Sequence, residues 1–152
     1  MTRQSVLETV VNHLAVQKQK SAIEVRDPNY GTSKNISCRY RGPKGLKCAV
    51  GAIIPDEIYD ENWEGWCISG IIFPEESEIG IFSRDSYNTA FLQRLQCVHD
   101  NYPVWDWYNH FIQIAEEYSL STKQIKHSLS TLKAIKPAII VDWNFAWRKT
   151  DA

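Results

Sequence analysis

Apolar residues recur at intervals of three and four along much of the chain, which is the spacing of one buried helix face. The pattern predicts helices near residues 5–18, 86–102, 104–118 and 122–133. Residues that commonly cap helices precede the first, second and fourth of these, and the fourth opens with a capping-box pattern. The inward face of the first helix is expected to carry Val6, Leu7, Val10, Val11, Leu14 and Ala15. That of the third helix is expected to carry Trp105, Tyr108, Phe111, Ile112 and Ala115.

Shorter apolar segments between these helices predict β-structure and turns. Residues 36–41 predict a strand that enters a tight turn at residues 42–45, where Pro and Gly supply the required backbone angles. The apolar run at 46–54 fits either the return strand of a hairpin or a short buried helix. A single helical turn is expected at 55–59, an irregular hairpin over 65–83, and a strand or extended segment over 138–147.

These elements together predict a single globular domain that spans residues 1–152. A chain of 152 residues can bury one core, no segment repeats at a fixed period, and no linker divides the sequence. We therefore expect a mainly α (α+β) fold with four to five helices around one core. A small β element near residues 36–54 and a β-like C-terminal tail complete it.

Charge and composition narrow the classes of partner and compartment. The 17 basic and 18 acidic residues nearly cancel, so no field of the whole molecule attracts nucleic acid, and a nucleic-acid partner is not expected. The first residues lack the pattern of a signal peptide, and no apolar run reaches the length of a membrane span. The sequence predicts a cytoplasmic protein without a membrane partner, whose four cysteines are reduced. Cys48 and Cys97 lie in apolar segments and are expected to be buried.

The most distinctive segment is a basic turn followed by an acidic stretch. Arg39, Arg41, Lys44 and Lys47 stand together with no acid among them, and five acids follow between positions 56 and 64 with no base among them. Guanidinium groups and glycine amides together suit an anion such as phosphate. In the alternative interpretation, the same bases pair with the acidic stretch inside the protein.

Around this turn the sequence resembles a family of small proteins that are common in bacteriophages and scattered in bacteria. Members share a Cys-x-Tyr-Arg-Gly-x-x-Gly-x-Lys-Cys-Ala-x-Gly-x-x-Ile-Pro-Asp core, a downstream Tyr and Glu-Gly, and a Leu-Gln-x-x-His-Asp helix. The resemblance covers about residues 36–107. It implies a shared fold and a phage or prokaryotic setting, and it implies no particular activity. The matching positions are Cys38, Tyr40, Arg41, Gly42, Gly45, Lys47, Cys48, Ala49, Gly51, Ile54, Pro55, Asp56, Tyr59, Glu64, Gly65, Leu95, Gln96, His99 and Asp100.

The chain departs from that family at three places. Ala52 stands where members often have a third Cys, and residues 65–83 and those beyond 136 look like additions.

The Leu-Gln-x-x-His-Asp part of the motif contains candidate binding or catalytic residues. His99 and Asp100, with Gln96 one turn earlier, form a polar group that could face Arg39 or Arg41. An imidazole beside a carboxylate is the usual material of general-base catalysis. No nucleophile motif, phosphate loop or dense carboxylate cluster accompanies the pair, so the sequence favours a binding role over catalysis.

Three cysteines could join His99 in a zinc site. Cys38, Cys48 and Cys97 would supply thiolates and His99 an imidazole, which suit a tetrahedral ion. The spacing lacks the close Cys-x-x-Cys pair typical of such sites, and buried structural thiols are the favoured interpretation. No metal and no other cofactor is therefore expected.

From these residues we expect a non-enzymatic binding protein of phage or prokaryotic origin. It would contact a host protein or a small anionic ligand such as a nucleotide, counter a host defence, and act in the host cytoplasm if it is phage-encoded. The alternative is a small enzyme or zinc-binding protein that uses Cys48, His99 and Asp100. The predicted ligand-binding residues are Arg39, Tyr40, Arg41, Lys44, Lys47, Gln96, His99 and Asp100.

Overall fold

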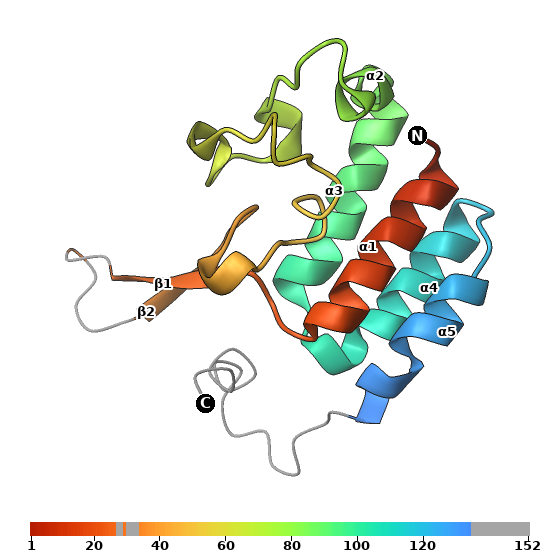
Figure 1. Cartoon of the computed structure of the whole chain (residues 1–152). Coiled ribbons are helices and arrows are strands. Elements are labelled where there is room, and N and C mark those ends of the chain that lie inside the picture. The colour runs from red at the N-terminus through yellow and green to blue at the C-terminus, as the bar shows by residue number, and fades with distance from the viewer. Residues whose placement is uncertain (27–28, 30–33, 135–152) are drawn as a thin grey trace.

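The computed structural model describes residues 1–26, 29 and 34–134 of the chain. It shows a body of packed helices with a two-stranded sheet and irregular loops on one side (Figure 1). The helices are α1 (Arg3–Gln17), α2 (Glu78–Ser83), α3 (Ser86–Asn101), α4 (Trp107–Glu117) and α5 (Lys123–Leu129), and the strands are β1 (Ala22–Arg26) and β2 (Lys34–Cys38). The predicted fold class, mainly α with a small β element, is confirmed.

Helix α1 lies in the middle of the helical body and packs against α3 and α5 (Figure 1). Thr2 caps its N-terminus, because the Thr2 hydroxyl accepts a hydrogen bond from the Ser5 N–H and the Thr2 N–H donates to the Ser5 hydroxyl. At the other end Lys18 adopts the left-handed conformation, with φ of 56°, that closes many helices. The predicted inward face is confirmed, with Val6, Leu7, Val10, Val11 and Leu14 fully buried and Ala15 at the edge of the core.

Helix α3 also begins where its cap predicts, because the Asp85 carboxylate accepts a hydrogen bond from the Tyr87 N–H. Helix α4 starts later than predicted, since Val104–Asp106 forms a separate 3-10 turn. The buried face of α4 also differs from the predicted one. Phe111 and Ala115 are buried as expected, but Trp107 and Ile114 take the places predicted for Trp105, Tyr108 and Ile112, which are only partly buried.

The capping box predicted from Ser121 to Gln124 forms only in part. The Ser121 hydroxyl accepts a hydrogen bond from the Lys123 N–H at 3.3 Å. The reciprocal bond is replaced, because the Ser121 N–H donates to Gln4 and the Gln124 side chain donates to Asn12 and Ser128. The apolar residues of α5 and of the 3-10 turn that follows it are nevertheless buried, among them Ile125, Leu129 and Leu132.

The small β element lies earlier in the chain than predicted. Strands β1 and β2 pair antiparallel, with Ala22 opposite Cys38. Beyond β2 the pairing shrinks to one bridge between Arg41 and Lys47, on either side of a 3-10 turn at Pro43–Gly45. Residues 46–54 form neither a return strand nor a helix, and residues 55–59 form a turn instead of the predicted helical one. The predicted β-like segment at 138–147 lies outside the described residues.

The irregular hairpin predicted over residues 65–83 is wrong. This stretch contains a 3-10 turn at Ile68–Gly70 and then helix α2. The chain folds back tightly before α2, since a Cβ atom on Gly80 would lie 2.0 Å from the carbonyl oxygen of Pro74. Of the β-forming residues there, Ile68, Ile71 and Phe73 are buried from turns, and Ile79 and Phe82 join the core from α2. Ile72 and Ile81 are exposed. No helix in the described part of the chain has the length and apolar character needed to cross a membrane.

We predict that Leu14→Asp unfolds the protein, because Leu14 is fully buried between helices and an unpaired carboxylate there costs several kcal/mol. The matched control is Val16→Asp on the exposed face of the same helix, since Val16 is 84% exposed. Urea unfolding followed by circular dichroism measures both. Equal stability of the two variants would contradict the assignment of the buried face.

Candidate functional site

Arg41 is built into the protein through hydrogen bonds with the loop that follows it. Its Nη1 donates to the Gly51 carbonyl at 2.6 Å, and its Nη2 donates to the Ile54 carbonyl at 2.6 Å. Nη2 also contacts the Asp56 carboxylate at 2.9 Å, and the guanidinium lies over the Tyr59 ring. The donors of Arg41 are thus used within the protein, as the intramolecular interpretation of the basic turn expects.

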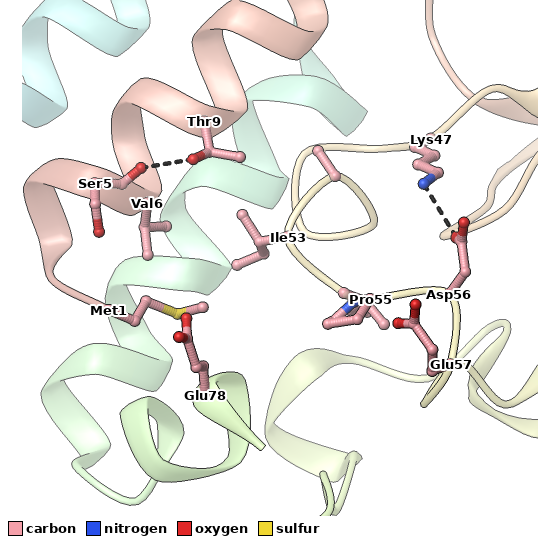
Figure 2. Close-up of a pocket in the computed structure, with 12 residues that line it drawn as sticks. Met1, Ser5, Val6, Thr9, Lys47, Ile53, Pro55, Asp56, Glu57 and Glu78 are labelled. Atoms are coloured by element: carbon pink, nitrogen blue, oxygen red, sulfur yellow. Dashed lines mark hydrogen bonds and ion pairs between the residues drawn. The ribbon is translucent and has the colours of Figure 1, made fainter.

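Lys47 pairs with the same acid. Its Nζ lies 3.1 Å from the Asp56 carboxylate, and Figure 2 shows the pair at the edge of a pocket of about 500 Å³ between α1 and the loop that contains Pro55. The hydrogen bond from Lys47, and then the charge of Arg41, lower the pKa of the Asp56 carboxyl. Glu57 and Glu78 also line this pocket, so carboxylates outnumber its side-chain cations. The pocket in Figure 2 is therefore poorly suited to an anion.

His99 lies fully buried near the end of α3, where both of its ring nitrogens are occupied. The Ser21 N–H donates to Nε2 at 3.0 Å, which requires a lone pair on that nitrogen. Nδ1 therefore carries the proton and donates to the Asp100 carboxylate at 2.7 Å. Burial lowers the pKa of His99 and keeps the ring neutral. This imidazole joins the start of β1 to α3 and has no free lone pair for a proton or a metal.

Two further side chains donate hydrogen bonds to Asp100, which lies beside this imidazole. Gln96 Nε2 donates to its carboxylate at 2.7 Å, and Lys20 Nζ donates to its main-chain carbonyl at 2.9 Å. Burial, and then the charge of Asp100, raise the pKa of the neighbouring Cys38 thiol far above its ordinary value. Burial lowers the pKa of Lys20 to about 8.

The potential metal ligands of this cluster are close together but poorly prepared for an ion. Atoms of Cys38, His99 and Asp100 lie within 4.8 Å of one another. A metal would have to displace the Ser21 N–H from His99 and remove the proton of a thiol that favours its neutral form. Burial also raises the pKa of Cys48 to about 12, and its sulfur accepts a hydrogen bond from the Gly51 N–H. The cluster is therefore arranged as a hydrogen-bonded network in which the Asp100 carboxylate accepts from the neutral imidazole and from Gln96.

A cleft of about 470 Å³ opens beside this network, between the end of β2, the loop before the 3-10 turn at Ile68–Gly70, and the second half of α3. Volumes of this order are typical of small-molecule sites. Its lining includes four of the predicted ligand-binding residues and several that the sequence did not single out. The predicted ones are Arg39, Tyr40, Gln96 and Asp100, and the others include Trp66, Cys67, Gln93, Cys97 and Asn101.

Arg39 is the cation of this cleft. Its Nε is buried and forms no hydrogen bond, the only side-chain nitrogen or oxygen in that state within the described residues. Buried polar atoms in proteins almost always have a partner, so the Arg39 guanidinium has hydrogen-bonding capacity that the described residues do not use. Arg39 also borders an adjacent hollow that Glu61 and Glu64 line.

Trp66 supplies an aromatic wall. Its side chain is 63% exposed, and its ring lies against Gly70, where a Cβ atom would be 3.2 Å from Trp66 Cε3. The Tyr40 hydroxyl donates to the Trp66 carbonyl at 2.6 Å and so holds this loop against β2. Only the exposure of its loop distinguishes Trp66 from a tryptophan of the core.

The cleft also collects all four cysteines of the chain. Cys48 is buried, as predicted, but the prediction that Cys97 is buried is wrong. Helix α3 turns Leu95 and Val98 into the core and leaves Cys97 on its exposed side, because adjacent helix positions point about 100° apart.

The predicted ligand-binding residues thus fall into separate places. Arg39, Tyr40, Gln96 and Asp100 line one cleft, and His99 lies buried next to it. Arg41 and Lys47 meet at Asp56, and Lys44 is exposed on the Pro43–Gly45 turn. Comparison of the chain with models of protein families, with curated proteins and with solved structures finds no match.

We predict that Arg41→Ala lowers the free energy of unfolding by about 2 to 4 kcal/mol, because the Gly51 and Ile54 carbonyls lose a charged donor. Arg84→Ala is the control, since Arg84 is exposed and its guanidinium donates to a single main-chain carbonyl, that of Glu75, so it should change stability by about 1 kcal/mol or less. Urea unfolding of both variants measures the difference. In a double-mutant cycle the losses from Arg41→Ala and Asp56→Ala should not add. Full additivity would show that the ion pair contributes nothing.

We also predict that the protein loses stability as the pH falls below about 6.5, the ordinary pKa of histidine. Below this pH, His99 takes up a proton in the unfolded chain, whereas burial opposes protonation of the same ring in the folded protein. The unfolded state therefore binds more protons, and the free energy of unfolding falls as the pH falls. Burial lowers the pKa of His13 as well, and His13 acts in the same direction. Unfolding curves from pH 7.5 to 5 should show a flatter profile for His99→Gln, while the exposed His127→Gln keeps the wild-type slope.

Proposed function

We propose that the protein is a non-enzymatic binding protein that holds a small anionic ligand of the nucleotide class in the cleft between β2 and α3. The observation that carries the proposal is the buried, unpaired Nε of Arg39 at this cleft. A phosphate group in the cleft would meet a guanidinium whose hydrogen-bonding capacity is not used within the described residues, and Arg–phosphate pairs are among the stronger hydrogen bonds in proteins.

The other walls of the cleft favour a nucleotide over a simple anion. The exposed ring of Trp66 offers a stacking surface for a planar base. The Asp100 side chain, 31% exposed, can accept hydrogen bonds from an exocyclic amine or a ribose hydroxyl. A cation, a carboxylate and an aromatic face around about 470 Å³ together match a ligand that has an anionic end, hydrogen-bond donors and a flat ring.

The state of the neighbouring network supports binding over catalysis. The His99 imidazole has no free lone pair, and burial keeps the Cys48 thiol protonated by raising its pKa to about 12. The alternative, a small enzyme or zinc-binding protein using Cys48, His99 and Asp100, would need both groups to be released from these states. A general base or a metal ligand needs an available lone pair.

The biological setting in this proposal rests on the motif that the chain shares with small phage and bacterial proteins. A phage-encoded protein that sequesters a nucleotide in the host cytoplasm would blunt a host defence that uses such a molecule as a signal. Contact with a host protein would serve the same end.

We predict that the full chain binds adenosine diphosphate, and that Arg39→Gln weakens this binding about 10- to 100-fold through loss of a charge-assisted contact. Trp66→Ala should weaken it about 5- to 100-fold through loss of stacking. Isothermal titration calorimetry measures both, with adenosine and pyrophosphate as partial ligands.

The matched controls are Arg84→Gln and Tyr87→Ala, an exposed arginine and an exposed aromatic residue that do not line the cleft. Both should bind as the unaltered protein does. Absence of nucleotide binding, or equal binding by Arg39→Gln and Arg84→Gln, would contradict the proposal.

A further inference from the structure

The acidic and basic residues of the chain are unevenly distributed. Residues 55–85 contain nine acidic residues and one basic residue, whereas the rest of the chain contains nine acidic and 16 basic residues. In Figure 1 this stretch, coloured yellow to green, lies in the upper part of the view and includes α2. Its one basic residue, Arg84, donates to the main-chain carbonyl of Glu75. The formal net charge of −1 therefore hides a strongly acidic region, whose field attracts basic partners.

The pocket in Figure 2 lies beside this region and combines an apolar wall with an acidic rim. Val6, Ile53 and Ile54 line it, and all three are buried. Figure 2 shows Glu57 and Glu78 on opposite sides of the pocket. In the described part of the chain neither of these two carboxylates forms a hydrogen bond or an ion pair. The rim of the pocket thus carries negative charge that the protein does not compensate.

Helix α2 extends this surface with an exposed apolar side chain. The helix packs against α3 and buries Ile79 and Phe82. Ile81, in contrast, is 54% exposed. It follows Glu78 by three positions, and side chains three apart are neighbours on a helix. We call Glu57, Glu78, Ile81 and the pocket together the α2 surface.

The chemistry of the α2 surface matches a basic segment of a protein better than it matches a simple cation. A Lys or Arg side chain has an apolar stem, which the buried wall of the pocket suits, and a charged head, which suits Glu57 and Glu78. A metal ion would use neither the apolar wall nor the exposed Ile81. Opposite charges on the two partners would also speed their encounter.

We propose that the α2 surface docks a basic amphipathic segment of a partner protein. One Lys or Arg of the segment inserts between Glu57 and Glu78, and an apolar residue of the segment covers Ile81. The proposal does not rest on nucleotide binding, because this pocket and the cleft between β2 and α3 share no lining residue. Nucleotide titrations test the cleft, and peptide titrations test the α2 surface.

The first experiment measures binding of defined peptides to the full chain by fluorescence anisotropy. A synthetic amphipathic peptide of lysine and leucine should bind, and binding should weaken as sodium chloride is added. Oligolysine should bind about three- to tenfold more weakly, because it offers no apolar residue to Ile81. A matching peptide of glutamate and leucine should not bind. Failure of the lysine–leucine peptide to bind, or equal binding by the glutamate–leucine peptide, would overturn the proposal.

The second experiment locates the binding surface with variants of the full chain. Glu57→Gln/Glu78→Gln should weaken binding of the lysine–leucine peptide about three- to twentyfold. The control Glu24→Gln/Glu116→Gln removes the same number of charges at exposed positions outside the pocket and should change binding less than twofold, about the effect of net charge alone. Equal weakening by the two double variants would show that only net charge matters, which would also overturn the proposal.

The contribution of Ile81 is tested in the same assay. Ile81→Ser should weaken binding of the lysine–leucine peptide about three- to tenfold through loss of apolar contact. Val16→Ser, at an exposed apolar position on α1, should leave it unchanged. Equal affinities of the two variants would contradict docking at α2.

A second copy of the chain is the competing occupant, because the rest of the sequence is rich in basic residues. Sedimentation of the full chain and of Ile81→Ser over a range of concentrations separates the two cases. We expect no self-association that depends on Ile81. Self-association that Ile81→Ser abolishes would assign the α2 surface to a contact between copies and would overturn the proposal.

Discussion

The charged network around Arg41 and Glu64 is the interaction on which the irregular half of the protein depends. The Glu64 carboxylate accepts hydrogen bonds from the main-chain N–H groups of Tyr40 and Arg41 and from the Tyr59 hydroxyl. Arg41 in turn binds main-chain carbonyls of the loop that follows it. The Glu64 and Arg41 side chains thereby take the place of the main-chain hydrogen bonds of a strand or helix, because they bind main-chain groups that would otherwise be buried without partners. Close approach completes the arrangement, since a Cβ atom on Gly51 would lie 2.2 Å from the Tyr40 carbonyl oxygen.

A second network attaches this half to the helices. Gln96 Oε1 accepts the Val50 N–H at 3.0 Å, and His99 accepts the Ser21 N–H, so neighbouring turns of α3 hold one loop each. Both side chains also donate to Asp100. Gln96, His99 and Asp100, which the sequence offers as candidate binding or catalytic residues, join α3 to the loops. The cost of burying these polar groups is offset because each one has a partner.

The cleft borders both networks, since Tyr40, Gln96 and Asp100 are among the residues that line it. The residues that line it without a structural hydrogen bond of their own are those that remain available to a ligand, above all the Arg39 guanidinium and the Trp66 ring. The same placement exposes Cys97.

The sequence by itself determined the helical body. Apolar spacing and capping residues place α1 and the start of α3, because both signals depend on residues within a few positions of each other. It also identified the segments that meet at the cleft, through Arg39, Tyr40, Gln96 and Asp100. Only the tertiary structure decided which bases remain available, since the Arg41 and Arg39 side chains differ in their distant partners and not in their local sequence. The same holds for residues 65–83, where close packing against Gly80 overrides the β propensity of single residues. Which side chains are paired and which are exposed depends on contacts between segments far apart in the chain, so the local sequence pattern cannot predict them.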